Sequence, residues 1–185
     1  TVLEQVLNLT RLVDDLLMIA RAESGALRIV PRTLDIREVI ESTLEKVQSL
    51  NSADTLSLSS EIAQSLPLIS CDPDRIAQVL MILLDNAVNY GGETLQVNVR
   101  AERQGDAVLI RLSDNGRGID ADALPFIFDR YFRAADARSG QGSGLGLAIA
   151  KAIIDAHHGS INASSSPGEG TCFTIVLPIT GEHRG

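Results

Sequence analysis

A glycine-rich segment of sequence GSGLGL, residues 142–147, joins a polar loop to an apolar helix predicted over 145–157. Glycines at this place let the backbone approach a ligand closely and expose N–H groups at the positive end of a helix. That arrangement suits a polyphosphate. A turn that simply requires glycine is the alternative, and three further patterns in the chain bear on the choice.

The second pattern, DNGRGI over 114–119, directly follows a strand expected over 108–112. Asp, Asn and Gly are common in tight turns, and taken alone the segment favours that interpretation. As part of a nucleotide site, the Asp114 carboxylate would accept a hydrogen bond from an exocyclic amine, which distinguishes adenine from guanine. The two glycines would let the chain pass closely beneath the base.

The third pattern is Asn86, an amide flanked by apolar residues on a helix predicted over 73–90. A polar group in such surroundings needs a partner. Asn86 is therefore either a locally satisfied or exposed helix asparagine, or a neutral oxygen ligand for Mg²⁺, a hard cation that prefers oxygen.

The fourth pattern, FIFDRYFR over 126–133, contains most of the chain's few aromatic residues. Some of these aromatics can close the core at a helix end. Core packing does not explain Arg130 and Arg133, which lie beside a polar, Ala- and Gly-rich segment. That segment, 129–143, offers little apolar surface to bury and predicts a mobile loop.

The elements that must position these residues follow from hydrophobic periodicity. Asp35 and Asp72 resemble helix N-caps, and Pro73 strengthens the second of these. Further helices are predicted over 35–50 and 120–127, and strands over 55–62, 66–71, 94–101, 107–112, 160–164 and 171–177. Mixed helices and strands, with paired strands adjacent in sequence, predict an α+β fold with a sheet covered by helices on one face.

The amino-terminal segment 1–24 predicts a long helix that Gly25 ends. Its apolar residues alternate four and three apart, which is a heptad seam, and further leucines widen the apolar face. A bundle formed between chains is favoured over a simple coiled coil, and packing of the helix on the chain's own core is the alternative. The seam residues are Val2, Val6, Leu9, Val13, Leu16 and Ala20.

Composition limits the class of protein. The chain has 185 residues, 44% of them hydrophobic, and a net charge of −8, which predicts a folded protein without the basic stripe of a duplex-binding domain. No apolar run approaches the roughly 20 residues that span a bilayer, and the start in mid-helix predicts an excised soluble fragment without a signal peptide. Cys71 and Cys172 lie beside strand-like runs, which favours two buried thiols over a disulfide.

Together the four patterns resemble the ATP-binding domain of a bacterial sensor histidine kinase, which has the GHKL-type ATPase fold. Their order matches an N box (83–90), a first glycine box (114–118), an F box (128–133) and a second glycine box (142–147). The segment 168–173 resembles the last glycine-and-threonine turn, and 72–80 resembles the approach to the N box. The resemblance covers about 32–178, and helix 1–24 resembles the second helix of the dimerisation and phosphoacceptor domain.

The resemblance implies a two-layer α/β sandwich with a mixed sheet. It divides the chain into a partial dimerisation helix (1–25), a linker (26–33), an ATP-binding catalytic domain (34–180) and a tail (181–185). It also implies a protein-histidine kinase that transfers the γ-phosphoryl group of ATP to a histidine, for relay to an aspartate of a response-regulator receiver domain.

As for its surroundings, the resemblance implies a cytoplasmic fragment of a sensor anchored in the inner membrane. The full-length protein would be a homodimer through the amino-terminal helix. This fragment would contact neither nucleic acid nor membrane.

The resemblance also implies a site for Mg·ATP, in which Asn86 holds Mg²⁺ and Asp114 binds the adenine amine. The base pocket would lie beside Tyr90, and Arg130 and Gln141 would reach phosphates, while no side chain of the fragment would act as a catalytic group. The expected cofactor-binding residues are Asn86, Asn89, Tyr90, Asp114, Gly116, Gly118, Ile119, Arg130, Gln141, Gly142, Gly144, Leu145, Gly146 and Thr171.

The sequence departs from the family pattern at three places. Its only histidines, His157, His158 and His183, lie outside an acceptor motif, so the fragment should not autophosphorylate at the usual site. Ile82 stands where a polar residue is usual, four before Asn86, and cannot activate water as a Glu does in hydrolysing relatives. Asn89 replaces a common Lys, which predicts weaker nucleotide binding.

Two alternatives follow from these departures. Ile82 and Asn89 favour, modestly, a degenerate nucleotide-binding signalling module without kinase activity. An ATPase of the topoisomerase, mismatch-repair or chaperone type is the other alternative, and the missing Glu argues against it.

Overall fold

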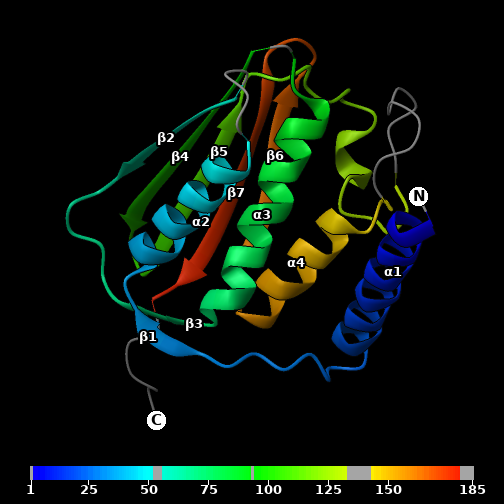
Figure 1. Ribbon diagram of the computed structural model, residues 1–185. Coiled ribbons are helices and arrows are strands. Elements are labelled where there is room, and N and C mark those ends of the chain that lie inside the picture. The colour runs from blue at the N-terminus through cyan, green and yellow to red at the C-terminus, as the bar shows by residue number, and fades with distance from the viewer. Residues whose placement is uncertain (1, 52–55, 93, 133–142, 180–185) are drawn as a thin grey trace.

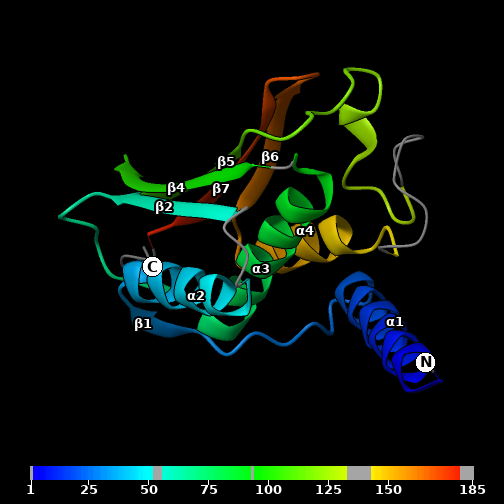
Figure 2. The same cartoon turned by 45° about the horizontal axis from the view of Figure 1, so that its top comes forward.

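The computed structural model of the chain describes residues 2–51, 56–92, 94–132 and 143–179. One layer is a five-stranded sheet, and three helices cover one of its faces (Figures 1 and 2). The predicted α+β fold, with helices on one face of a sheet, is confirmed.

The sheet is mixed, with strand order β2-β4-β5-β7-β6. Strand β2 runs parallel to β4, and the remaining neighbours are antiparallel. A separate antiparallel pair joins β1 to β3. The strands are β1 (Arg32–Leu34), β2 (Leu56–Ile62), β3 (Ile69–Cys71), β4 (Leu95–Gln104), β5 (Ala107–Asp114), β6 (Ser160–Ser166) and β7 (Gly170–Pro178).

The helices are α1 (Val2–Glu23), α2 (Ile36–Leu50), α3 (Pro73–Tyr90) and α4 (Gly146–Ala156). The short helix expected over 120–127 forms only in part, as the 3-10 helix η1 (Leu124–Phe126), and no regular α-helix forms there. Pro125 explains the difference, since proline supplies no N–H for a regular helical hydrogen bond. The tail 181–185, which includes His183, lies outside the described residues.

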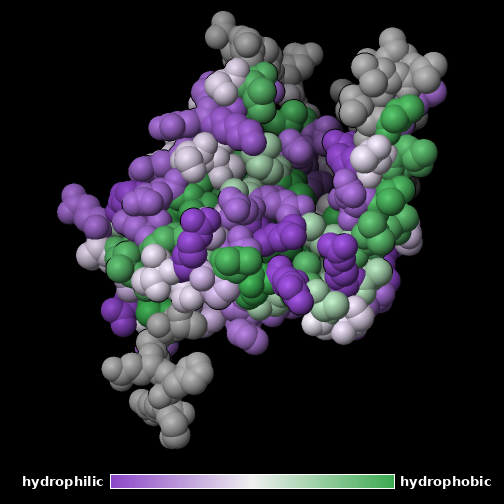
Figure 3. Space-filling model, turned by 60° about the horizontal axis from the view of Figure 1, so that its bottom comes forward, coloured by the Kyte–Doolittle hydropathy of each residue, from purple (hydrophilic) through white to green (hydrophobic). Residues whose placement is uncertain are grey.

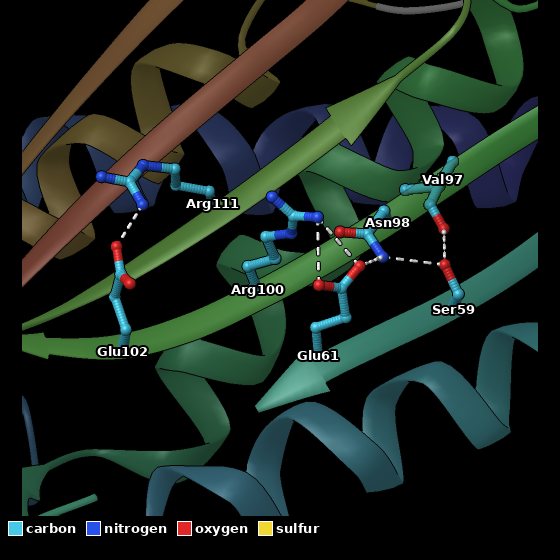
Figure 4. Close-up of polar contacts among 7 residues, drawn as sticks. All are labelled: Ser59, Glu61, Val97, Asn98, Arg100, Glu102 and Arg111. Carbon is cyan, nitrogen blue, oxygen red and sulfur yellow. Dashed lines mark hydrogen bonds and ion pairs between the residues drawn. The ribbon is translucent and has the colours of Figure 1, made fainter. Parts of the chain in front are cut away.

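The two faces of the sheet differ in chemistry, as strand alternation requires. On β4, Val97, Val99 and Ala101 are buried beneath the helices. On the opposite face Arg100 forms an ion pair with Glu61 at 3.0 Å, and Figure 4 shows this pair within a row of polar contacts across β2, β4 and β5. A charged and hydrogen-bonded outer face explains why helices cover only one side.

Asp72 joins three parts of the fold at the start of α3. Its Oδ1 accepts hydrogen bonds from the N–H groups of Asp74 (3.1 Å) and Arg75 (3.2 Å), which caps the helix. Its Oδ2 accepts one from the N–H of Val30 (2.8 Å), in the segment that follows α1. Burial by itself would raise the pKa of Asp72, but these hydrogen bonds and the charge of Arg75 outweigh it and hold the pKa below its usual value.

His157 connects the end of α4 to the same place. Its Nε2 accepts a hydrogen bond from the backbone N–H of Asp72 (3.0 Å), and its Nδ1 donates to the carbonyl of Ile153 (2.8 Å). Both ring nitrogens of this buried histidine are therefore used inside the fold.

Helix α1 packs on the chain's own core through one part of its surface. Ile19 is only 5% exposed, and the Sδ atom of Met18 accepts a hydrogen bond from Gln78 of α3 (3.8 Å). The rest of its apolar stripe stays exposed, and Figure 3 shows hydrophobic side chains along the side of the molecule where α1 lies. The exposed stripe comprises Val6, Leu9, Leu12, Val13, Leu16 and Leu17.

The alternative expectation for α1, packing on the chain's own core, therefore holds for one part of the helix, and the expected bundle between chains stays a prediction for the exposed stripe. The apolar stripe of α1 is too wide to be buried completely against one partner.

The two cysteines are free thiols, as predicted. Cys71 is buried, and desolvation raises its pKa to about 11. The expectation of burial is wrong for Cys172, which is half-buried because its side chain lies on the outer face of β7.

Among the described residues, none of the helices combines the length and the apolarity that a bilayer crossing requires.

We predict that Asp72→Ala lowers the free energy of unfolding by about 1–3 kcal/mol, because the N–H groups of Asp74, Arg75 and Val30 lose their acceptor. Asp35→Ala, which removes the cap of α2 and one backbone hydrogen bond, is the matched control and should cost less. Urea unfolding of both variants measures the difference. An Asp72 effect no larger than the Asp35 effect would show that the Val30 contact adds nothing.

The same carboxylate gives a pH dependence of known sign. Because the folded-state pKa of Asp72 is lowered, its stabilisation is complete above the unfolded pKa of about 4 and is lost as the pH falls through the folded value. The stability gap between the wild type and Asp72→Ala should therefore shrink below about pH 4.

Candidate functional site

Asp114 ends β5 and is held by two backbone donors from different segments. Its Oδ1 accepts hydrogen bonds from the N–H of Gly116 (2.8 Å) and, more weakly, from the N–H of Thr171 on β7 (3.3 Å). Burial raises the pKa of Asp114, although the two hydrogen bonds act in the opposite direction. Oδ2 accepts no hydrogen bond from the described residues, so it can accept one from a ligand.

Glycines surround this carboxylate where no side chain fits. Gly170 has φ +87°, and a Cβ on it would overlap the backbone carbonyl of Asp114. Gly118 has φ +75°, and a Cβ there would overlap the carbonyl of Ser166. The loop after β5 therefore lies directly against the turn between β6 and β7, and both contacts require glycine.

The end of α3 also lies against the loop that follows β5. The N–H of Arg117 donates to the carbonyl of Tyr90 (3.4 Å), and the Arg117 guanidinium lies 5.0 Å from the centre of the Tyr90 ring. A Cβ on Gly116 would come within 3.1 Å of the Tyr90 carbonyl oxygen. The loop, Tyr90 and Asp114 therefore meet at one end of the sheet. Asn89, beside Tyr90, is exposed.

Asn86 lies one turn before Tyr90 on α3. Its Nδ2 donates to the carbonyl of Ile82 (2.8 Å), so the amide nitrogen is used within the helix and the amide oxygen is the group left for a ligand. Ile82 packs against the start of α4, where a Cβ on Gly146 would lie 3.3 Å from its Cγ2. The crossing of α3 and α4 thus explains an apolar residue at this position.

The second glycine box contacts the F box. The N–H of Tyr131 donates to the carbonyl of Gly144 (2.9 Å), and both residues have positive φ. Leu145 is buried and anchors the start of α4. Gln141, Gly142, Arg133 and most of the loop expected over 129–143 lie outside the described residues.

Arg130 contacts a different part of the molecule. Its guanidinium forms an exposed ion pair with Glu23 near the end of α1. A groove of about 810 Å³ between α1 and α4 lies beside this pair, and Asn86, Tyr90 and Asp114 are not among the residues that line it.

Ser165 and Glu23 are the residues that the sequence did not single out. The hydroxyl of Ser165 accepts a hydrogen bond from the N–H of Ile119 (2.8 Å) and contacts both Gly170 and Thr171. Strand periodicity was the available signal, since Ser165 shares the inner face of β6 with Ile161. Nothing in the sequence pairs Glu23 with Arg130, because the contact depends on how α1 docks.

Comparison with known proteins places this geometry in a family. The profile of the family described as histidine kinase-, DNA gyrase B-, and HSP90-like ATPase matches residues 71–181. Sensor protein KdpD of Escherichia coli is 38% identical over 176 residues, which cover 95% of this chain and 19% of that protein. The adaptive-response sensory kinase SasA of Thermosynechococcus vestitus is 36% identical over 176 residues, which cover 95% of this chain and 46% of that protein.

Solved structures agree. The Acinetobacter baumannii histidine kinase AdeS superposes with a TM-score of 0.79 at 28% identity, covering 97% of this chain and 82% of that chain. Full-length ShkA in complex with AMPPNP gives a TM-score of 0.82 at 26% identity, covering 95% of this chain and 36% of that chain. The chain therefore belongs to the histidine kinase-, DNA gyrase B- and HSP90-like ATPases, and within them to the catalytic domains of bacterial sensor histidine kinases.

Proposed function

We propose that this chain binds Mg·ATP with the adenine base over the loop that follows β5. The observation that carries the proposal is the half-buried Asp114 carboxylate, which two backbone N–H groups orient while Oδ2 remains available. An adenine amine donates a hydrogen bond to such an acceptor, whereas the carbonyl of guanine at the same ring position would face it with a second acceptor. In this arrangement Gly116, Gly118 and Ile119 lie along the base, Tyr90 flanks the ring, and the Thr171 N–H orients the carboxylate.

In the proposed site Mg²⁺ would have one protein ligand, a side-chain oxygen. The described part of the chain contains no group of three or more His, Cys, Asp and Glu side chains that could hold a metal ion. A single amide oxygen, from Asn86, fits Mg²⁺ because this ion keeps several waters and takes other ligands from substrate phosphates. When bound, Mg²⁺ supplies charge that offsets the negative charge of the transferring phosphoryl group.

The phosphate end would face the start of α4. Gly144, Leu145 and Gly146 lie at the amino end of a helix of 11 residues, where N–H groups and the helix dipole favour anions. In the proposal Gln141, Gly142 and Asn89 complete this end, and Arg130 joins them only when its guanidinium leaves Glu23. Positioning and charge stabilisation then account for most of the catalysis, as in other phosphoryl transfers.

The reaction we propose is transfer of the γ-phosphoryl group to a histidine of the longer protein, followed by relay to an aspartate of a response-regulator receiver domain. The chain spans only 19% of KdpD and 46% of SasA, so the whole protein's activity extends beyond this chain. The acceptor histidine, the response regulator and the dimer partner are therefore part of what we propose. Ile82, packed against Gly146, carries no carboxylate to activate water, which favours transfer over steady hydrolysis.

Asp114→Asn should weaken ATP binding by about 1.5–3 kcal/mol, because the amine loses a charge-assisted acceptor. Titration calorimetry with Mg·ATP measures this loss, with thermal unfolding to show that the variant is folded. Asp120→Asn, an exposed carboxylate in the same loop, is the control and should bind normally. Equal ATP affinity of Asp114→Asn and the wild type would refute the base assignment. Phosphoryl transfer from ATP to a separate fragment that carries an acceptor histidine should fall in parallel.

Two glycines with similar backbone angles allow a matched test of the site geometry. Gly170→Ala should displace Asp114 and lower ATP affinity at least tenfold, because the new Cβ overlaps the Asp114 backbone. Gly168 has φ +80° but open space around it, so Gly168→Ala carries a similar backbone cost without the overlap. Thermal unfolding and ATP titration of both variants separate the two effects. Equal ATP affinities of Gly170→Ala and Gly168→Ala would contradict the proposal that the start of β7 positions Asp114.

For the open face of α1, we predict that replacing both Leu9 and Leu16 by Ser abolishes self-association and leaves ATP binding intact. The two side chains are 62% and 43% exposed, whereas Ile19 at the docked position is 5% exposed. Ile19→Ser, at the docked position, should instead loosen α1 from α4. Sedimentation with an ATP titration tests both statements. Lost ATP binding in the double variant would mean that the catalytic domain does not begin after the linker.

A further inference from the structure

Ser165 lies where three backbone segments of the site meet. It is on β6, opposite Thr171 of β7 in the sheet register. Its Oγ lies 2.8 Å from the N–H nitrogen of Ile119, 2.7 Å from the carbonyl oxygen of Gly170 and 3.0 Å from Oγ1 of Thr171. One hydroxyl therefore joins the loop after β5 to the start of β7.

The hydrogen-bonding capacity of this hydroxyl is used completely. A serine hydroxyl donates once and accepts twice. Ser165 donates to the Gly170 carbonyl, which is its shorter contact, and accepts from the Ile119 N–H. The Thr171 hydroxyl can then donate to the remaining lone pair. Such a saturated junction fixes the relative position of its partners more firmly than one contact does.

The junction leads directly to the Asp114 carboxylate. The N–H of Thr171 is one of the two donors to Oδ1, and Gly170 lies against the Asp114 backbone. A shift of Gly170 and Thr171 would therefore move one of the two groups that orient the carboxylate. Thr171 is buried, so water cannot readily replace a lost partner.

The neighbouring serines do not share this environment. Ser164 and Ser166 are exposed, because alternate residues of a strand point to opposite faces. Only the middle residue of this serine run lies on the side that faces the loop.

We propose that Ser165 is a positioning residue for recognition of the adenine amine, because it fixes the Thr171 N–H that orients Asp114. The proposal rests on the proposed function of Asp114 and adds a residue that does not itself touch the nucleotide. A serine that only stabilised the β6–β7 turn would affect all nucleotides alike. A positioning residue affects most strongly the nucleotide that uses the oriented carboxylate.

The test compares Mg·ATP with the magnesium complex of purine riboside triphosphate, which lacks only the 6-amino group. Calorimetry on the whole 185-residue chain should show that the wild type prefers ATP. Ser165→Ala should weaken ATP binding roughly 5- to 30-fold, and affect the analogue much less, so that the preference shrinks. Equal losses for both nucleotides, or no loss, would overturn the proposal.

Matched variants separate the hydroxyl from shape and folding. Ser165→Thr keeps the hydroxyl and Ser165→Val has nearly the same shape without it, and both β-branched residues suit a strand. The Thr variant should keep more of the ATP preference than the Val variant, and equal preferences would overturn the proposal. Ser164→Ala, at the exposed neighbour, should behave as the wild type, and a similar loss there would also overturn it.

Asp114→Asn, measured beside these variants, separates the two levels of inference. If it keeps the preference for ATP, the assignment of the base to Asp114 fails, and the role of Ser165 fails with it. If it abolishes the preference while Ser165→Ala leaves the preference unchanged, only the role of Ser165 fails.

Discussion

A half-buried carboxylate that needs donors from two separate segments is the constraint on which the rest of the site depends. Burial raises the cost of the charge on Asp114, and the N–H groups of Gly116 and Thr171 offset part of that cost. These donors can meet only if β5 and β7 are neighbours and the loop after β5 turns back at once. The antiparallel pairing of β5 with β7 supplies the first condition, and glycine supplies the second.

The helical layer holds Asn86 and the start of α4, which we propose form the other end of the site. Asn86 and the start of α4 face the same region because α3 and α4 approach closely where Ile82 meets Gly146. The distance between the proposed base end and the proposed phosphate end therefore depends on helix packing as well as on the sheet. Close-packed cores resist adjustment, so the two ends are positioned by the same buried residues that stabilise the fold.

The sequence could predict much of this arrangement, because its strongest signals are local. The cap at Asp72, the helix to Tyr90 and the glycine loop after β5 all follow from short-range chemistry that the structure keeps. The short helix expected after Asp120 is shorter than predicted, because Pro125 and the surrounding turns leave room only for a 3-10 segment. Ser165 was missed because its environment depends on strand register and on a loop nearly fifty residues away along the chain.

The ion pair between Arg130 and Glu23 also joins residues far apart in the chain, and it bears on the proposed function. An exposed ion pair contributes little to stability by itself, so α1 stays in place mainly through the apolar contact of Ile19. A guanidinium engaged by Glu23 is not free to contact a phosphate. If Arg130 does bind nucleotide phosphate, the docked position of α1 and nucleotide binding compete for one side chain. Linkage makes such competition reciprocal, so nucleotide would weaken the docking of α1 by the same factor by which docked α1 weakens nucleotide binding.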